Sequence, residues 1–366
     1  MAEFDTIEDL ARYIKRNLDA STSKKNILAL FAFNSTGKTR LTKILSTADD
    51  ENEVDNGQTK VLCYNAFLED IFKWDNENYI LTFDTNSWII NLIIEQGLDG
   101  VIVDNFNDVI NLKIEPSFDF TKGEVTFNIV SGDNRSTTNI KISKGEESVL
   151  IWSVFYAVLK TAVDALNTNE ADRTTPIFND LKYIIIDDPV SSIDDTRIIT
   201  IAIKLIETVQ SCQNNAVKFF ITTHHALFYN VIVNNFNKNA RDRKCSFRSY
   251  SLLKDNYIFR LSEKGDAPFS YHLSVKEIIQ EAIESNNLEK YHFNFFRNIL
   301  EKTANFLGYS HWTDCVAKDN KQKFIRLLNL YSHGKLSDLE SRELSGEDKN
   351  LFKETFNNFM THFKWN

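Results

Sequence analysis

A loop of small polar residues, followed by a lysine and a threonine, lies near the N-terminus, and these residue types can bind phosphate. Residues 32–39 (AFNSTGKT) fit the pattern G-x-x-x-x-G-K-[ST], with Ala32 in place of the first glycine. In such a loop, backbone N–H groups and the N-terminus of the following helix hold phosphate oxygens, Lys38 reaches the β- and γ-phosphates, and Thr39 binds Mg²⁺. The pattern predicts a nucleoside triphosphate site made of Asn34, Ser35, Thr36, Gly37, Lys38, Thr39 and Arg40.

Two adjacent carboxylates, Asp187 and Asp188, could complete the chemistry of phosphate hydrolysis. They follow the apolar run 183–186 (YIII), which has the pattern of a buried strand. A protein core does not tolerate two unpaired carboxylates, so they belong at the end of that strand. We expect Asp187 to complete the Mg²⁺ shell with Thr39, and Asp188 to orient or deprotonate the attacking water, where a glutamate is usual. The alternative is a solvated Asp-Asp-Pro turn at the end of an ordinary strand.

Three further segments resemble motifs of ABC-type ATPases. Residues 142–148 (ISKGEES) resemble the signature motif, residues 189–194 (PVSSID) the D-loop, and residues 219–224 (FFITTH) the segment that ends in the switch histidine. The resemblance implies a head-to-tail dimer in which the signature of one subunit faces the phosphate loop of the other. Any one segment alone could be a capping turn or a core histidine. The residues implied are Ser143, Lys144, Gly145, Glu146 and Asp194 for nucleotide binding and His224 for hydrolysis.

The elements that must position these residues alternate between strand and helix. Residues 26–33, 183–186 and 218–222 have the pattern of buried strands, and residues 197–210 have helical periodicity, which indicates an α/β layer architecture. Residues 115–142 show short alternating strands, and after residue 270 the pattern is mostly helical. The sequence predicts an α/β ABC-type ATPase head, with a mixed sheet and an antiparallel β subdomain, over residues 1–262. A mainly α-helical C-terminal domain follows over residues 263–366.

Composition and charge limit the classes of protein that the chain can be. Its 42% hydrophobic and 25% charged residues are globular values, which exclude disordered and collagen-like chains. The net charge is −9, yet residues 290–335 hold eight Lys or Arg against three acidic residues, so a polyanion would bind locally. The four cysteines form no C-x-x-C pair, which argues against a disulfide framework or a zinc site.

No segment near the N-terminus has the pattern of a secretory signal. Apolar stretches such as residues 88–94 are shorter than the ~20 residues that a membrane helix needs. We therefore expect a cytoplasmic protein with no membrane partner. About a hundred residues without sustained heptads separate the two halves of the nucleotide site, which excludes the long coiled coils of SMC-type chromosome proteins.

Over nearly its whole length the chain resembles the PrrC-type anticodon nucleases. The segments that carry this resemblance are residues 31–41, 64–76, 143–156, 187–192, 269–273 and 297–309. In that family an N-terminal ABC ATPase is coupled to a C-terminal nuclease domain that cuts tRNA-Lys in the anticodon loop. The resemblance implies an antiphage toxin, usually held latent by a type I restriction-modification enzyme. It also implies ATP or GTP with Mg²⁺ in the head, and dTTP as a regulatory nucleotide.

The resemblance places the nuclease site at Arg297, Glu301 and His333. Arg297 and Glu301 are four residues apart, so on a helix they share one face. A guanidinium, a carboxylate and an imidazole suffice for metal-free RNA cleavage, which needs a base for the ribose 2′-hydroxyl, an acid for the leaving 5′-oxygen and a cation for the phosphate. The products would be a 2′,3′-cyclic phosphate and a 5′-hydroxyl. Which of Glu301 and His333 is the base stays open, and without the resemblance all three would be ordinary surface residues.

Residues 264–272 (KGDAPFSYH) stand where the family recognises tRNA. Asp266 could accept a hydrogen bond from a cationic wobble-base modification, and Phe269, Tyr271 or His272 could stack on an unpaired base. The alternative for this segment is a Gly-Asp turn before an amphipathic helix.

Two other functions fit parts of the sequence. A non-cleaving SMC/RecF-like ABC ATPase, acting in DNA repair or regulation, would share the head but not the nuclease chemistry. A DNA nuclease would normally use clustered acidic residues for Mg²⁺, and the C-terminal region offers no D-x-D or E-x-K cluster.

Overall fold

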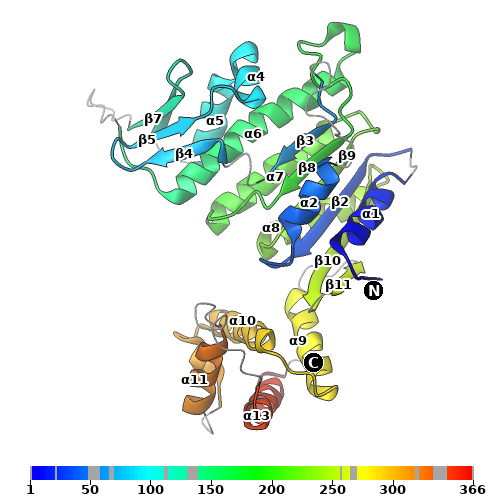
Figure 1. Cartoon of the computed structure of the whole chain (residues 1–366), viewed down its shortest axis with the longest axis vertical. Helices are drawn as coiled ribbons and strands as arrows, with labels where there is room; N and C mark the ends of the chain where they lie inside the picture. The colour runs from blue at the N-terminus through cyan, green and yellow to red at the C-terminus, as the bar shows by residue number, and fades with distance from the viewer. Residues whose placement is uncertain are drawn as a thin grey trace. The chain divides into compact units, whose positions relative to one another are not determined.

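The computed structural model describes ten stretches of the chain, and it divides into two compact units, Met1–Pro268 and Phe269–Asn366 (Figure 1). We refer to these as the head and the C-terminal unit, and each is described by itself. The described residues are 2–20, 23–47, 58–65, 70–110, 114–129, 139–255, 258–263, 270–317, 321–332 and 344–364.

A seven-stranded mixed sheet in the order β1-β11-β10-β2-β9-β8-β3 forms the centre of the head. The five strands from β10 to β3 are parallel, and β11 and β1 continue the sheet in antiparallel fashion. Central strands such as β2 are buried along their full length, as expected when both faces of a parallel sheet are covered. The strands are β1 (Ala2–Phe4), β2 (Asn26–Ala32), β3 (Val61–Tyr64), β8 (Tyr183–Asp187), β9 (Lys218–Thr223), β10 (Ser246–Asp255) and β11 (Ile258–Glu263).

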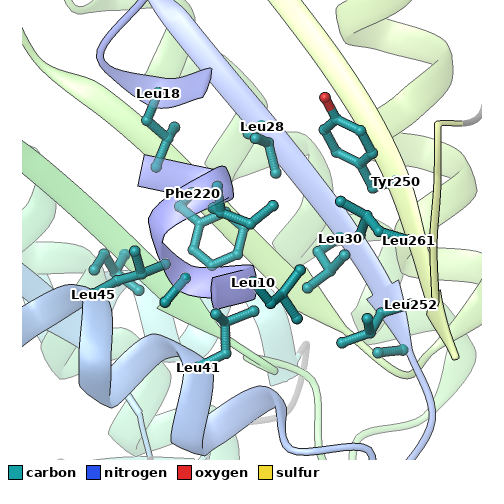
Figure 2. Close-up of a cluster of buried hydrophobic side chains, with 14 of the residues drawn as sticks. Leu10, Leu18, Leu28, Leu30, Leu41, Leu45, Phe220, Tyr250, Leu252 and Leu261 are labelled. Carbon is teal, nitrogen blue, oxygen red and sulfur yellow. The ribbon is translucent and has the colours of Figure 1, made fainter. Parts of the chain in front are cut away.

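Two helices, α1 (Ile7–Leu18) and α2 (Lys38–Thr47), close the main apolar cluster of the head. Figure 2 shows Leu10 of α1 and Leu41 of α2 against Leu30 of β2 and Phe220 of β9. All four side chains are almost completely buried, and burial of each contributes about 1.5–3 kcal/mol. The cluster fixes α2, and therefore the loop before it, relative to the central strands. Two further helices of the head are α7 (Asp195–Ser211) and α8 (Ala226–Arg241).

A second, four-stranded antiparallel sheet in the order β4-β5-β7-β6 forms a subdomain of the head. Its hairpin between β6 and β7 turns at Gly123, which has φ +71°, and a Cβ there would lie 2.7 Å from the Phe83 carbonyl oxygen. Only glycine fits this position without displacing the backbone. The elements are β4 (Phe72–Asp75), β5 (Ile80–Phe83), α4 (Trp88–Gln96), α5 (Asp99–Ile110), β6 (Ile114–Asp119) and β7 (Glu124–Ile129).

The long helix α6 (Lys144–Asn167) connects the two parts of the head by packing against both α5 and α7 (Figure 1). By length and composition alone it could cross a membrane, so the expectation that every apolar stretch is too short was wrong. However, 78% of its apolar window is buried inside the protein. Its apolar surface is that of a core helix.

The described part of the C-terminal unit is helical around an aromatic core. Phe296 of α10 contacts Phe324, Phe352 and Phe356 of the neighbouring helices, with ring centroids 5.2–5.7 Å apart. α10 ends at Gly308 in the left-handed conformation, a frequent helix stop. The elements are α9 (Ser270–Glu284), α10 (Lys290–Leu307), the short 3₁₀ helix η2 (Trp312–Cys315), α11 (Lys321–Ser332) and α13 (Gly346–Phe363).

Candidate functional site

The loop between β2 and α2 has an unusual backbone in the region of the predicted phosphate site. Ser35 and Gly37 have φ values of 66° and 99°. The Thr36 hydroxyl donates to the Phe33 carbonyl at 2.7 Å, and a Cβ at position 37 would lie 3.1 Å from Ile7 Cδ1. Left-handed residues outside glycine are uncommon and gather at functional turns. A turn of this kind in front of a helix N-terminus is suited to hold an anion.

The three neighbouring parallel strands β2, β9 and β8 bring their carboxyl ends to the same edge of the sheet. Phe31 of β2 is in register with Thr223 of β9, and Thr222 of β9 is in register with Asp187 of β8. The phosphate-binding loop and the carboxylates are therefore adjacent. Such an edge is the usual ligand position in parallel α/β sheets.

Asp187 is 4% exposed, and hydroxyl groups surround its carboxylate. Thr222 donates to it at 2.5 Å and Thr42 at 3.2 Å, and Thr39 also hydrogen-bonds to it. Burial raises the pKa of Asp187, while these three hydrogen bonds oppose the rise. The Thr39 hydroxyl and the Asp187 carboxylate are thus neighbours, which is the arrangement that two oxygen ligands of one Mg²⁺ require.

Asp188, Lys38 and His224 form one charged cluster. His224 Nδ1 lies 2.5 Å and Lys38 Nζ lies 3.6 Å from Asp188 Oδ2. Burial alone would raise the pKa of Asp188, but the hydrogen bonds from His224 and the electrostatic interactions with His224 and Lys38 outweigh it and lower the pKa. Burial lowers the pKa of Lys38, and Asp188 and Asp187 oppose that change. Asp188 also has φ 55°, in the left-handed region that non-glycine residues rarely adopt.

Lys38 holds a defined position within the loop. Its ammonium group donates to the carbonyls of Ala32 at 3.0 Å and Phe33 at 3.1 Å, and lies 3.5 Å from Asn34 Oδ1. Arg40, the last residue predicted for this site, pairs instead with Glu8 of α1 at 2.8 Å on the exposed surface. Arg40 therefore lies on the exposed surface beside α1, whereas Asn34 to Thr39 form the loop and the start of α2.

The predicted signature and D-loop segments contact each other. Ser143 caps α6, its hydroxyl accepting from the Glu146 N–H while its own N–H donates to Glu146 Oε2 at 2.6 Å. A Cβ on Gly145 would lie 3.1 Å from the carbonyl oxygen of Ser192, which has φ 65°. Asp194 caps α7 by accepting from the Arg197 N–H. Lys144, also predicted, pairs with Glu147 at 2.8 Å.

The predicted D-loop segment is hydrogen-bonded to the end of β8, whereas the predicted signature segment is not. The Ser191 hydroxyl donates to the Asp188 carbonyl at 3.3 Å, and His225 lies 3.6 Å from Asp195. Within the described part of the chain, no hydrogen bond or ion pair joins residues 143–146 to Lys38 or Asp188.

In the C-terminal unit, three side chains hold the Arg297 guanidinium. Its Nε donates to Glu301 Oε1 at 2.8 Å along α10, and its Nη1 donates to Asn329 of α11 at 3.2 Å. The guanidinium carbon lies 5.4 Å from the ring centroid of Trp312 in η2, within cation–π range. The Arg297 side chain is 22% exposed and that of Glu301 is 42% exposed, so both can be reached from solvent.

The chain is 38% identical to an anticodon nuclease of Escherichia coli, and the alignment covers 100% of this chain and 95% of the relative. This chain belongs to the anticodon nuclease family. The family described as "AAA domain" matches residues 94–364, most of the chain. The predicted family is confirmed, and with it an enzyme that combines nuclease activity with a nucleotide-hydrolysing head.

Solved structures of SMC heads are also similar to this anticodon nuclease. The SMC head bound to the C-terminal winged-helix domain of ScpA is 10% identical with a TM-score of 0.32, and covers 62% of this chain and 61% of that chain. The SMC head domain from Thermotoga maritima is 11% identical with a TM-score of 0.30, and covers 66% and 91%. The predicted fold class, an α/β head with an additional antiparallel sheet and a helical C-terminal part, agrees with the observed sheets and helices.

Several residues predicted for the nuclease lie where side chains are not described. His333 follows the last residue of α11 in sequence but lies outside the described residues, as do Asp266 and Phe269. Tyr271 and His272 fall within the first turns of α9, whose side chains there are likewise outside the description.

The sequence analysis missed Trp312 and Asn329, which hold Arg297 from outside its own helix. They lie 15 and 32 positions from Arg297. No spacing rule connects them to it, because their contact arises only when η2 and α11 pack against α10. It also missed Thr42 and Thr222, whose hydroxyls donate to Asp187. The apolar strand pattern around Thr222 gave no sign of such a role.

Proposed function

We propose that the protein is a nucleotide-regulated endoribonuclease that cleaves tRNA-Lys in the anticodon loop and acts as an antiphage toxin. The observation that carries the proposal is the Arg297–Glu301 pair, held in place on α10 of a chain that is related over its full length to an anticodon nuclease. We assign the ATPase to residues 1–262 and the nuclease to residues 263–366.

The proposed cleavage is a transesterification that needs no metal. The ribose 2′-oxygen attacks phosphorus, the bond from phosphorus to the 5′-oxygen breaks, and a 2′,3′-cyclic phosphate and a 5′-hydroxyl result. Glu301 and His333 share the two proton transfers, one taking the 2′-hydroxyl proton and the other giving a proton to the leaving oxygen. Arg297 stabilises the charge that builds up on the phosphate oxygens. The guanidinium is suited to this role because Glu301, Asn329 and Trp312 fix its orientation.

In the head, Asn34 to Thr39 would bind the phosphates of ATP or GTP, with Thr39 and Asp187 as protein ligands of Mg²⁺. When bound, the ion supplies charge neutralisation between the phosphates. Lys38 and His224 keep Asp188 ionised, and the carboxylate would orient or deprotonate the attacking water. Ser143, Lys144, Gly145, Glu146 and Asp194 would complete the site of a second subunit in a head-to-tail homodimer.

Other parts of the proposal come from the family resemblance. Asp266, Phe269, Tyr271 and His272 would recognise the tRNA. dTTP would act as a regulatory nucleotide, and a type I restriction-modification complex would hold the cytoplasmic enzyme latent. Closure of the head dimer by nucleotide would then control the nuclease.

The test is to incubate the purified full-length protein with total tRNA in the presence of ATP or GTP and Mg²⁺, and to map the RNA ends by sequencing. We expect one cut in the anticodon loop, with cyclic phosphate and 5′-hydroxyl termini. Glu301→Gln should reduce the rate about 10²- to 10⁴-fold. Glu284→Gln, an exposed residue at the end of α9, is the matched control and should cut normally.

Each negative result has a separate meaning. A protein that hydrolyses nucleotide and binds nucleic acid but never cuts would support the non-cleaving ATPase instead. Ends with a 3′-hydroxyl and a 5′-phosphate would contradict the proposed mechanism, because attack by the ribose 2′-oxygen leaves a 2′,3′-cyclic phosphate and a 5′-hydroxyl. Full activity of Glu301→Gln would contradict the site.

A further inference from the structure

Two consecutive threonines at the end of β9 contact the two consecutive aspartates at the end of β8. Thr222 Oγ1 donates to Asp187 Oδ1 at 2.5 Å, and Thr223 Oγ1 donates to Asp188 Oδ1 at 3.2 Å. The two strands are parallel neighbours, and Thr222 is in register with Asp187. The pairing of β8 with β9 therefore puts one hydroxyl group beside each carboxylate.

Both threonine side chains are almost completely buried, with exposed fractions of 0% for Thr222 and 2% for Thr223. Valine has nearly the same shape as threonine and is equally suited to a strand, so the sheet itself does not require a hydroxyl group at these positions. A buried hydroxyl group costs free energy unless it forms a hydrogen bond. The two hydroxyl groups are therefore explained by the carboxylates that they contact, and not by the packing of the sheet.

Thr222 occupies one oxygen of Asp187, the proposed Mg²⁺ ligand. The other oxygen, Asp187 Oδ2, accepts from the Thr42 hydroxyl at 3.2 Å. The Thr42 hydroxyl also lies 3.1 Å from the Thr39 carbonyl oxygen of its own helix, so it has a second acceptor when Oδ2 is used by an ion. Residues that orient a metal ligand in this way typically change metal affinity about 10- to 100-fold.

Thr223 contacts the other carboxylate, which the proposed mechanism directs at the attacking water. Asp188 Oδ1 accepts from the Thr223 hydroxyl and from the His224 N–H, each at 3.2 Å. Thr223 Oγ1 in turn accepts from the His225 N–H at 3.0 Å. The Thr223 hydroxyl therefore links the Asp188 carboxylate to the backbone that follows β9.

We propose that Thr222 and Thr223 are positioning residues with separate tasks in nucleotide hydrolysis. Thr222 orients Asp187 for the metal ion, and Thr223 orients Asp188 for the attacking water. This inference rests on the proposed function of the head, and it does not depend on the proposed nuclease. A threonine that only satisfied a buried carboxylate would affect stability alone, whereas positioning predicts that each threonine affects a different step.

The first test measures the binding of Mn²⁺, in place of Mg²⁺, by electron paramagnetic resonance. It uses the full-length protein with a non-hydrolysable analogue of the nucleotide that the protein hydrolyses. Thr222→Val keeps the shape of the side chain but removes the hydroxyl, and should weaken Mn²⁺ binding about 10- to 100-fold. Thr222→Ser should restore most of the affinity, and Thr223→Val should bind Mn²⁺ as the parent does.

The second test measures phosphate release at saturating nucleotide and Mg²⁺. Thr223→Val should lower kcat about tenfold or more, because a hydrogen bond to a charged group is lost, and Thr223→Ser should restore the rate. Thr222→Val should instead raise the Mg²⁺ concentration that gives half the maximal rate, with kcat close to that of the parent.

Thr208→Val is the matched control for both tests. Thr208 is a buried threonine of α7, and its hydroxyl is hydrogen-bonded to Tyr156 Oη at 3.1 Å and to the Lys204 carbonyl at 2.9 Å. The same substitution at this position should leave Mn²⁺ affinity and kcat unchanged. Thr222→Ala and Thr223→Ala, which also lack the hydroxyl, should show the same split between the two measurements as the valine variants.

The split between the two threonines decides the inference. Equal losses of Mn²⁺ affinity in Thr222→Val and Thr223→Val overturn it, and so does the absence of any loss in both tests. A loss that serine does not restore also overturns it, because packing and not the hydroxyl would then be responsible. A parent protein that binds no nucleotide with Mn²⁺ refutes the proposed nucleotide site itself, whereas a parent that binds both regardless of Thr222 refutes only the positioning.

Discussion

Removing two contacts that hold Arg297 from outside its helix, those with Asn329 and Trp312, should slow RNA cleavage while the fold stays intact. Asn329→Ala deletes the acceptor that lies 3.2 Å from Arg297 Nη1. Trp312→Ala deletes the ring that lies 5.4 Å from the guanidinium carbon. The pair with Glu301 is an i,i+4 ion pair that contributes only about 0.3–0.5 kcal/mol, too little by itself to hold one rotamer.

The size of the effect follows from the two lost contacts. An exposed hydrogen bond contributes about 0.5–1.5 kcal/mol and an exposed cation–π contact about 0.5–1 kcal/mol. If that energy is what aligns Arg297 with the phosphate, the double variant loses about 1–2.5 kcal/mol of transition-state stabilisation. This corresponds to a rate reduced roughly 5- to 70-fold. Each single variant should lose roughly 2- to 10-fold.

The assay is single-turnover cleavage of tRNA at saturating enzyme, with the RNA dissociation constant measured separately. The rate should fall while affinity changes little, and Asn329→Asp should restore the rate because a carboxylate accepts from the guanidinium more strongly. Gln322→Ala, exposed on the same α11, is the control. A double variant that cuts at the normal rate, or a rate loss that tracks a fall in melting temperature, would refute the positioning argument.

Three predictions concern the head. Asp188→Asn should bind nucleotide but release phosphate about 10²- to 10⁴-fold more slowly, as measured by phosphate release and filter binding. Because the pKa of Asp188 is lowered by folding, its negative charge stabilises the fold above pH 3.8, the unfolded value, and this stabilisation is lost as the pH falls through the lower folded pKa. The pKa of Asp187 is raised by folding, so its negative charge destabilises the fold at neutral pH. Asp187→Asn should therefore raise, and Asp188→Asn lower, the melting temperature at pH 7, and a shift of the same sign in both would contradict this reasoning. In Gly145→Val the new side chain would press against the Ser192 carbonyl, so hydrolysis by the proposed dimer should fall while nucleotide binding stays unchanged.

The order of strands and motifs in the head could be predicted from the sequence. Three predicted strands are confirmed as β2, β8 and β9, at residues 26–33, 183–186 and 218–222. Short apolar runs that end in turn residues are typical of buried strands, which is why the sequence sufficed here. The predicted helix at residues 197–210 is confirmed as α7. Their parallel pairing then brings the carboxylates and the phosphate loop together without further information.

Long-range side-chain contacts could not be predicted. Trp312 and Asn329 have no motif, and their role depends on the packing of η2 and α11 on α10. The exposure of Phe306 could not be predicted either, since the helical periodicity of α10 is compatible with a buried aromatic at that position. The burial of α6 likewise depends on α5 and α7, which no local pattern specifies.

The chain order of the central sheet has a consequence during translation. β2 pairs with β9 and β10, which the ribosome makes about 190–220 residues later, so the phosphate loop has no supporting sheet until most of the head has been synthesised. The last strand, β11, ends at Glu263, just before the C-terminal unit begins. At about 5–20 residues per second, the remaining chain takes several more seconds to emerge. The head of a newly made copy, which is the proposed regulator, can thus fold before the C-terminal unit, which is the proposed nuclease, has been synthesised.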